Sequence, residues 1–163
     1  RDYYASRGLG DVYKRQSLDK MEQCEGFDCG HPYDISVISK AEAILNCRFS
    51  KQLTHYLSKY GYIGFFGVEL YGITKSDFSN EVLEGNMVEW TLHERIVSRL
   101  DNLWIPIRFE DDGYMAFMDY NTLNSEGEPR IILSHDTDAG YIFDQVLADD
   151  LGDYLFALVE DMC

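Results

Sequence analysis

Apolar residues recur at helical spacing in the first regular part of the chain. One stripe predicts a helix that ends near Asn46, and it consists of Ile38, Ala41, Ile44 and Leu45. This helix can begin at any of three capping residues, Asp34, Ser36 or Ser39. A second helix is predicted over residues 50–60, because Ser50 is a suitable N-cap and Gly61 a suitable stop.

Strand-forming and helical patterns succeed one another in the rest of the chain. Residues 64–73 are rich in aromatic and β-branched side chains and predict a strand. Apolar residues then recur every four positions, which indicates a helix along Val88, Leu92, Ile96 and Leu100. Three later strands are predicted over residues 103–107, 114–120 and 130–133, and the last two of them form a hairpin. A final helix is predicted over residues 149–160.

Helices and strands are segregated in this order rather than alternating one by one. The pattern predicts an α+β fold with N-terminal helices, a mainly antiparallel sheet and a C-terminal helix. The chain has 163 residues, 45% of them hydrophobic, which is enough for a single domain with one core. It has no run of about 18 uncharged apolar residues, so we expect a soluble protein without a membrane partner.

The first 33 residues differ from the rest of the chain. Residues 1–16 carry four basic and two acidic residues without an amphipathic period, and their ending, DVYKRQ, resembles a translated artefact found at the ends of assembled environmental contigs. We expect part of this segment not to be native and to carry no function. Residues 17–33 also lack periodicity. We therefore expect a non-core leader over residues 1–33 and the folded domain over residues 34–163.

The four cysteines give little support for a metal site or a disulfide framework. Cys24, Cys29 and His31 offer three soft ligands within eight residues, but no convincing fourth ligand occurs at zinc-site spacing. No secretion signal precedes them. We expect reduced thiols, a cytoplasmic location, and neither a bound metal nor a cofactor.

Charge is the strongest compositional signal. The chain has 14 Lys and Arg against 29 Asp and Glu, a net charge of -15. From residue 109 onward there are fourteen acidic residues and one basic residue, Arg130. Nucleic acids and anionic membranes repel such a chain, so we expect no direct nucleic-acid binding. The acidic third either provides solvated charge or is shaped for a basic partner.

Several motifs, in this order and spacing, resemble the SUKH superfamily, named for a yeast cell-wall-assembly regulator and its bacterial relatives. The resemblance covers about residues 35–161, and no single motif is specific. Its parts are the two predicted N-terminal helices, Gly67–Gly72, Trp104–Ile107, Asp112–Tyr114 leading to Asp119, and Leu147–Leu155. A Gly-x-x-Leu-Pro joint common between the first two helices is replaced here by Asn46–Ser50.

The resemblance implies a domain that acts by binding proteins. Many bacterial members look like immunity proteins that neutralise a cognate polymorphic toxin, whereas eukaryotic ones look like regulatory scaffolds. It implies no shared catalytic site. The residues agree: Glu110–Asp112 lack the spacing of a calcium loop, and His93 and His135 have no nucleophile beside them. We expect no enzyme activity and no catalytic residue.

The acidic C-terminal third is complementary in charge to a toxin with a basic surface, so we expect such a toxin as the partner. We expect steric blocking without chemistry, through acidic residues around an aromatic side chain. Trp90 lies off the apolar stripe of its helix, so it is either at the helix edge or exposed. The candidate partner-binding residues are Trp90, Glu110, Asp111, Asp112, Tyr120, Asp149 and Asp150.

Overall fold

The computed structural model of the chain describes residues 17–78 and 85–163. Residues 1–16, where the artefact is predicted, lie outside the described residues. The helices are α2 (Ile35–Leu45), α3 (Lys51–Lys59), α4 (Met87–Val97) and α5 (Leu151–Met162), preceded by a helical segment over residues 17–22. The strands are β1 (Asp28–Cys29), β2 (Ile63–Phe65), β3 (Val68–Leu70), β4 (Trp104–Asp111), β5 (Tyr114–Leu123), β6 (Pro129–Thr137) and β7 (Gly140–Ala148).

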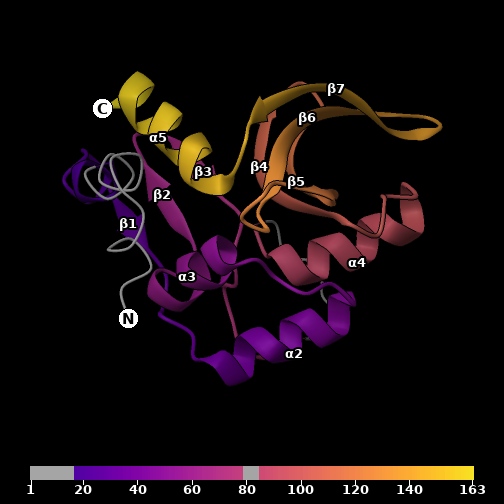
Figure 1. The fold of residues 1–163 in the computed structure, drawn as a ribbon, viewed down its shortest axis with the longest axis horizontal. Coiled ribbons are helices and arrows are strands. Elements are labelled where there is room, and N and C mark those ends of the chain that lie inside the picture. Colours follow the sequence, from indigo (N-terminus) through magenta and orange to yellow (C-terminus); the bar gives the residue numbers. More distant parts are fainter. Residues whose placement is uncertain (1–16, 79–84) are drawn as a thin grey trace.

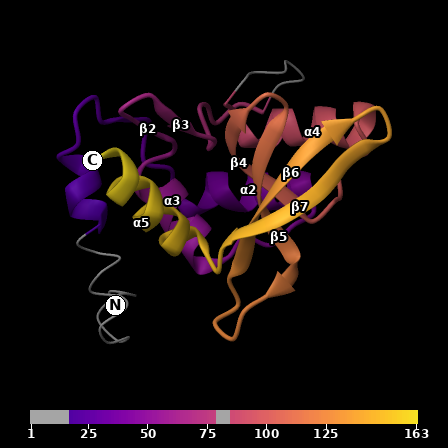
Figure 2. The same ribbon diagram turned by 90° about the horizontal axis from the view of Figure 1, so that it is seen from above.

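The strands form two antiparallel sheets, which confirms the predicted α+β fold. β1, β2 and β3 make a small sheet, and β4 to β7 make a four-stranded meander in chain order. In both ribbon views the small sheet and α5 lie on one side of the molecule and the meander on the other (Figures 1 and 2). One continuous hydrophobic core joins them. Among the described residues, no helix is both long and apolar enough to cross a membrane.

Local capping chemistry fixes the N-terminal helices as predicted. The Asp34 side chain accepts from the backbone N–H groups of Ser36 (3.0 Å) and Val37 (3.2 Å), so Asp34 is the N-cap among the three candidates. Asn46 ends α2 in the left-handed conformation. Ser50 caps α3 by accepting from the backbone N–H of Leu53. Each of the two N-caps, Asp34 and Ser50, satisfies a backbone donor that the first helical turn leaves unpaired.

The predicted apolar stripe of α4 is wrong at Ile96, whereas Leu92 is partly buried against the core and Leu100, after the end of the helix, is buried. Val88 is fully buried, but the side chain of Ile96 is 82% exposed, and the buried face is completed by Met87, Glu89 and Thr91. The reason is geometric, because a helix turns about 100° per residue and a four-residue repeat drifts by about 40° each time. Two repeats after Val88, the stripe has rotated off the core.

Two strand predictions also need correction. Residues 64–73 are not one strand but the hairpin β2–β3, whose turn residues Phe66 and Gly67 both have positive φ. Strand β7 was missed entirely. Its residues 142–146 are all exposed, and two register shifts against β6 disturb the usual alternation of buried and exposed side chains. The hairpin predicted over residues 114–133 is confirmed as β5–β6.

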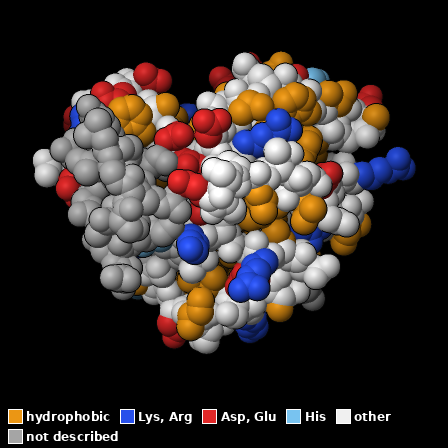
Figure 3. Space-filling model, in the orientation of Figure 1, with side chains coloured by type: hydrophobic (Ala, Val, Ile, Leu, Met, Phe, Trp, Pro, Cys, Tyr) orange, Lys and Arg blue, Asp and Glu red, His pale blue; other side chains and the backbone are white. Residues whose placement is uncertain are grey.

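The face seen in Figure 3 carries charges of both signs. Acidic side chains gather near its middle, with Lys and Arg side chains below them and at one edge. Three of the acids in the C-terminal third are not on any surface, since Asp119, Glu128 and Asp150 are buried. The acidic third is therefore only partly an acidic surface.

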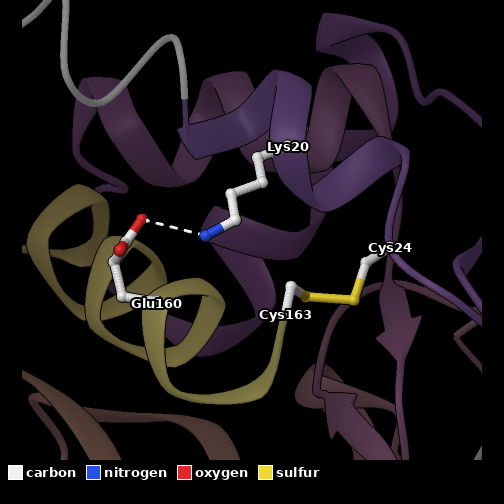
Figure 4. Close-up of a disulfide and its surroundings, with 4 residues drawn as sticks. All are labelled: Lys20, Cys24, Glu160 and Cys163. Atoms are coloured by element: carbon white, nitrogen blue, oxygen red, sulfur yellow. Dashed lines mark hydrogen bonds and ion pairs between the residues drawn. A yellow bond between two sulfur atoms is a disulfide. The ribbon is translucent and has the colours of Figure 1, made fainter.

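Residues 17–33 contribute to the core, contrary to the predicted leader. Met21 is fully buried, and Cys29 in β1 pairs with Ile63 of β2. Cys24 forms a disulfide with Cys163, so the prediction of reduced thiols is wrong for this pair (Figure 4). Beside the disulfide, Lys20 forms an ion pair with Glu160 at 3.3 Å. Cys29 and Cys47 are free.

Candidate partner-binding surface

Two hairpin turns meet at one end of the four-stranded sheet. Asp112 and Gly113 join β4 to β5 with φ values of 47° and 83°, the positive pair that a type I′ turn requires. The turn between β6 and β7 lies at the same end, because the strands are antiparallel neighbours. The backbone N–H of Asp136 donates to the Gly113 carbonyl at 3.2 Å, which joins the two turns. Asp111, Asp112, Asp136 and Asp138 are all exposed at this end.

A hollow beside these turns has aromatic walls. Its aromatic lining residues come from four separate elements or their flanks: Tyr71, Trp90, Phe109 and Tyr141. Trp90 meets Tyr71 edge-on with ring centroids 5.6 Å apart, and it meets Tyr141 at 6.4 Å. The buried side chain of Met115 also lines the hollow, while Phe109 remains 51% exposed. We call this feature the aromatic hollow.

Carboxylates border the aromatic hollow. Glu94 of α4 and Asp136 of β6 both line it. The Tyr141 hydroxyl donates to Glu94 Oε1 at 3.4 Å, and the Ser98 hydroxyl donates to Glu94 Oε2 at 2.6 Å. Burial, and then the nearby charges of Glu94 and Asp136, raise the pKa of Tyr141 above its usual value. The hollow is thus a region of negative potential beside apolar rings.

Trp90 is partly buried rather than freely exposed. Besides Tyr71 and Tyr141, its ring contacts Phe117 of the sheet, with centroids 6.1 Å apart. This is the helix-edge position that the sequence left open. The ring therefore packs α4 against the sheet and lines the hollow at the same time. A contact with a partner stays a prediction for this residue.

Glu110 has a structural role within the fold. It accepts from the Tyr154 hydroxyl at 2.6 Å and from Arg108 Nη1 at 3.0 Å. The bond from Tyr154 attaches α5 to the end of β4, and the bond from Arg108 lies within β4. Burial of Tyr154, followed by the charge of Glu110, raises the pKa of that tyrosine.

The remaining three candidates lie at the opposite end of the sheet. Strand β5 runs from Tyr114, beside the Asp112 turn, to Tyr120, a separation of about 20 Å at the usual rise per residue. Asp149 and Asp150 come after β7 at that far end, where Ala148 pairs with Ile131. The structure thus divides the seven candidates between two ends of the sheet.

Two of these three are internal connections. Asp150 is only 3% exposed, caps α5 through the backbone N–H of Asp153, and accepts from Gln52 Nε2 at 3.1 Å. The Tyr120 hydroxyl accepts from the backbone N–H of Ser50 at 3.0 Å, and burial raises the pKa of Tyr120. Only Asp149 is exposed.

Sequence reasoning identified Trp90, Asp111 and Asp112 but missed the other members of this surface. Phe109 lies just past the predicted strand 103–107, and Tyr141 belongs to a strand that was not predicted. Glu94 and Asp136 appeared as ordinary charges in the sequence. The available signal was a polar turn after β4 and another after β6. In an antiparallel meander, alternate turns lie at the same end of the sheet, so these two turns could have been placed together.

The comparisons with known proteins are consistent with this architecture. A search of the curated proteins found no match. The family model SUKH_5, described as SMI1-KNR4 cell-wall, matches residues 16–157, which include the helical segment over residues 17–22, both sheets and half of α5. Since the match spans most of the chain, the protein belongs to the SMI1-KNR4 family of the SUKH superfamily.

Proposed function

We propose that this protein is a non-catalytic binding domain that acts as an immunity protein, neutralising a cognate toxin by steric blocking. The observation that carries the proposal is the aromatic hollow beside two acidic turns. Aromatic side chains in partly open pockets are typical anchors of protein interfaces. Family membership supports the same class of function. The resemblance to the SUKH superfamily implies a domain that binds proteins without a shared catalytic site, and many bacterial members look like immunity proteins.

The charge of this surface favours a partner with a basic surface. Asp111, Asp112, Asp136 and Asp138 lie together at the exposed sheet end, and Glu94 lies in the hollow. A toxin that attacks nucleic acid needs a basic surface for phosphates, and an acidic domain can occupy that surface. Complementary charges of this kind accelerate association and are screened by salt.

A regulatory or scaffolding domain without a toxin partner is the second candidate. The family description, SMI1-KNR4 cell-wall, favours it. The same hollow would then bind a regulatory partner. The genes beside this one distinguish the two candidates, because only immunity requires an adjacent toxin gene.

Co-expression tests the immunity proposal. The toxin domain encoded next to this protein is expressed in a susceptible host alone, with this protein, and with a variant carrying Asp111→Asn and Asp112→Asn. We expect rescue by the wild-type protein and weaker rescue by the variant. The matched control, Asp149→Asn with Asp161→Asn, removes the same charge from exposed positions outside the turns and is expected to rescue fully. Equal killing with and without the wild-type protein refutes the immunity proposal.

A further inference from the structure

We propose that the aromatic hollow binds an arginine side chain of the partner protein. The inference deepens the proposed function, since it names the chemistry that the binding surface recognises. Three features carry it: the aromatic walls, the two carboxylates in the lining, and the absence of a basic side chain among the described lining residues.

The aromatic walls fit a flat, weakly hydrated cation. Trp90, Tyr71 and Tyr141 surround the hollow with ring planes at steep angles to one another, 87° and 61° relative to Trp90. Phe109 is the exposed wall. A guanidinium group stacks on one aromatic face while its N–H donors point outward in the guanidinium plane. Such a contact contributes about 0.5 to 2 kcal/mol, depending on its desolvation.

The carboxylates give the cation its hydrogen-bond partners. The hydroxyls of Ser98 and Tyr141 hold Glu94 in place from within the protein. An ionised carboxylate accepts about four hydrogen bonds, so both oxygens of Glu94 can still accept further donors. Asp136 lies on the exposed side of the same lining. The Glu94 acceptor is therefore in place before a ligand arrives, which lowers the entropic cost of binding.

Two of the three nearby arginines of this chain bind partners outside the hollow, and the third does not line it. Arg95 donates to the backbone carbonyls of Leu45 and Asn102, both at 2.7 Å. Arg108 pairs with Glu110 at 3.0 Å. Arg99 lies exposed against Gly140 and is not part of the lining. The negative charge in the hollow is therefore not neutralised by the arginines beside it, which favours a cation supplied by another molecule.

Arginine fits better than lysine or an apolar side chain. Lysine carries a compact, strongly hydrated ammonium that cannot stack and bond two carboxylates in one plane. An apolar side chain would desolvate Glu94 and Asp136 without replacing their hydrogen bonds with water. A guanidinium group meets both demands, because its face contacts the rings and its edge contacts the carboxylates.

The test uses capped tripeptides, Gly-Arg-Gly, Gly-Lys-Gly and Gly-citrulline-Gly, titrated into the full chain while the indole N–H resonances are followed by NMR. Trp104→Phe assigns the Trp90 signal. We expect the arginine peptide to shift the Trp90 signal saturably, the lysine peptide to bind more weakly, and the uncharged citrulline peptide to cause no saturable shift.

Two variants locate the binding site. Glu94→Gln removes the charge and keeps one acceptor oxygen, so one of the two hydroxyls, of Tyr141 or Ser98, can still donate to the side chain while the other can accept from its amide N–H. Asp136→Asn removes the second charge. Each is expected to weaken the arginine peptide about tenfold, the equivalent of about 1.4 kcal/mol. Asp149→Asn, at the far end of the sheet, is expected to leave binding unchanged.

The outcomes separate this inference from the immunity proposal. No saturable Trp90 shift, equal shifts from arginine and citrulline, or equal affinity in Glu94→Gln overturns the arginine site, whatever co-expression shows. A normal peptide titration together with unprotected cells overturns immunity and leaves the arginine site standing for the regulatory candidate. Stronger binding of lysine than of arginine also overturns the proposal.

Discussion

At the residue scale, neighbouring acids in the sequence have unrelated roles. Asp149 is exposed, whereas Asp150 caps α5 and binds Gln52 in the interior. Asp119 is likewise buried and accepts from Arg130 Nε at 3.0 Å and from the backbone N–H of Asn121. The acidic third therefore contains both buried carboxylates that stabilise the fold and carboxylates on the surface. Their hydrogen-bond partners distinguish the two kinds.

The adjacent pair at positions 149 and 150 gives a direct test of this distinction. Asp150→Ala removes the N-cap and leaves Gln52 Nε2 without this acceptor, so we expect it to lower the free energy of unfolding by about 2 kcal/mol. Asp149→Ala is expected to change it by less than about 0.5 kcal/mol. Urea denaturation followed by circular dichroism measures both. Equal effects would contradict the assigned roles.

A second residue-scale test concerns the glycine next to Tyr71 of the hollow. A Cβ atom on Gly72 would lie 1.9 Å from the Gly61 carbonyl oxygen, so the two backbone segments could not keep their approach. We expect Gly72→Ala to cost about 3 kcal/mol of stability. Gly64→Ala meets only an ordinary contact at 3.6 Å and serves as the control in thermal denaturation. A Gly72→Ala protein as stable as this control would show that the segments can separate.

At the element scale, α4 both packs the sheet and forms one wall of the hollow. Its buried positions are Met87, Val88, Glu89 and Thr91, while Ile96 points to solvent. We expect Met87→Ala to destabilise the protein by about 2 to 4 kcal/mol through the cavity it leaves, and Ile96→Ala to have almost no effect. Chemical denaturation of the two variants decides between the observed face and the four-residue stripe. A large loss for Ile96→Ala would restore the stripe.

Sequence reasoning succeeded for elements whose signal is local. The Asp34 and Ser50 caps, the hairpin β5–β6 and the C-terminal helix all depend on residues a few positions apart. It failed for β7, an edge strand whose exposed apolar and polar residues have no simple alternation. It could not assemble the hollow either, because Tyr71, Trp90, Phe109 and Tyr141 come together only through tertiary packing.

At the scale of the whole molecule, the Cys24–Cys163 disulfide joins the first and last described parts of the chain. It spans 139 residues, so it removes much conformational freedom from the unfolded state. We expect Cys24→Ser with Cys163→Ser to lower the free energy of unfolding by about 4 kcal/mol. Cys29→Ser, a change at a free cysteine, is the control for loss of a thiol. A reducing agent should destabilise the wild-type protein and the Cys29→Ser variant, which keep the disulfide, but not the double variant, which lacks it. If all three proteins lose the same stability in the reducing agent, the disulfide does not contribute to the free energy of unfolding.

The surface as a whole determines how the protein meets its partner, and charge and aromatic contact have separate kinetic effects. The acids of the two turns act before contact, so Asp111→Asn with Asp112→Asn should slow association several-fold at low salt and matter less at high salt. Phe109 acts after contact through its exposed ring, so Phe109→Ala should speed dissociation about tenfold and leave the salt dependence intact. Surface plasmon resonance with the immobilised toxin domain measures both rates. Two results would contradict docking at this end of the sheet: an Asp111→Asn, Asp112→Asn variant that changes only the dissociation rate, or a Phe109→Ala variant that changes only the association rate.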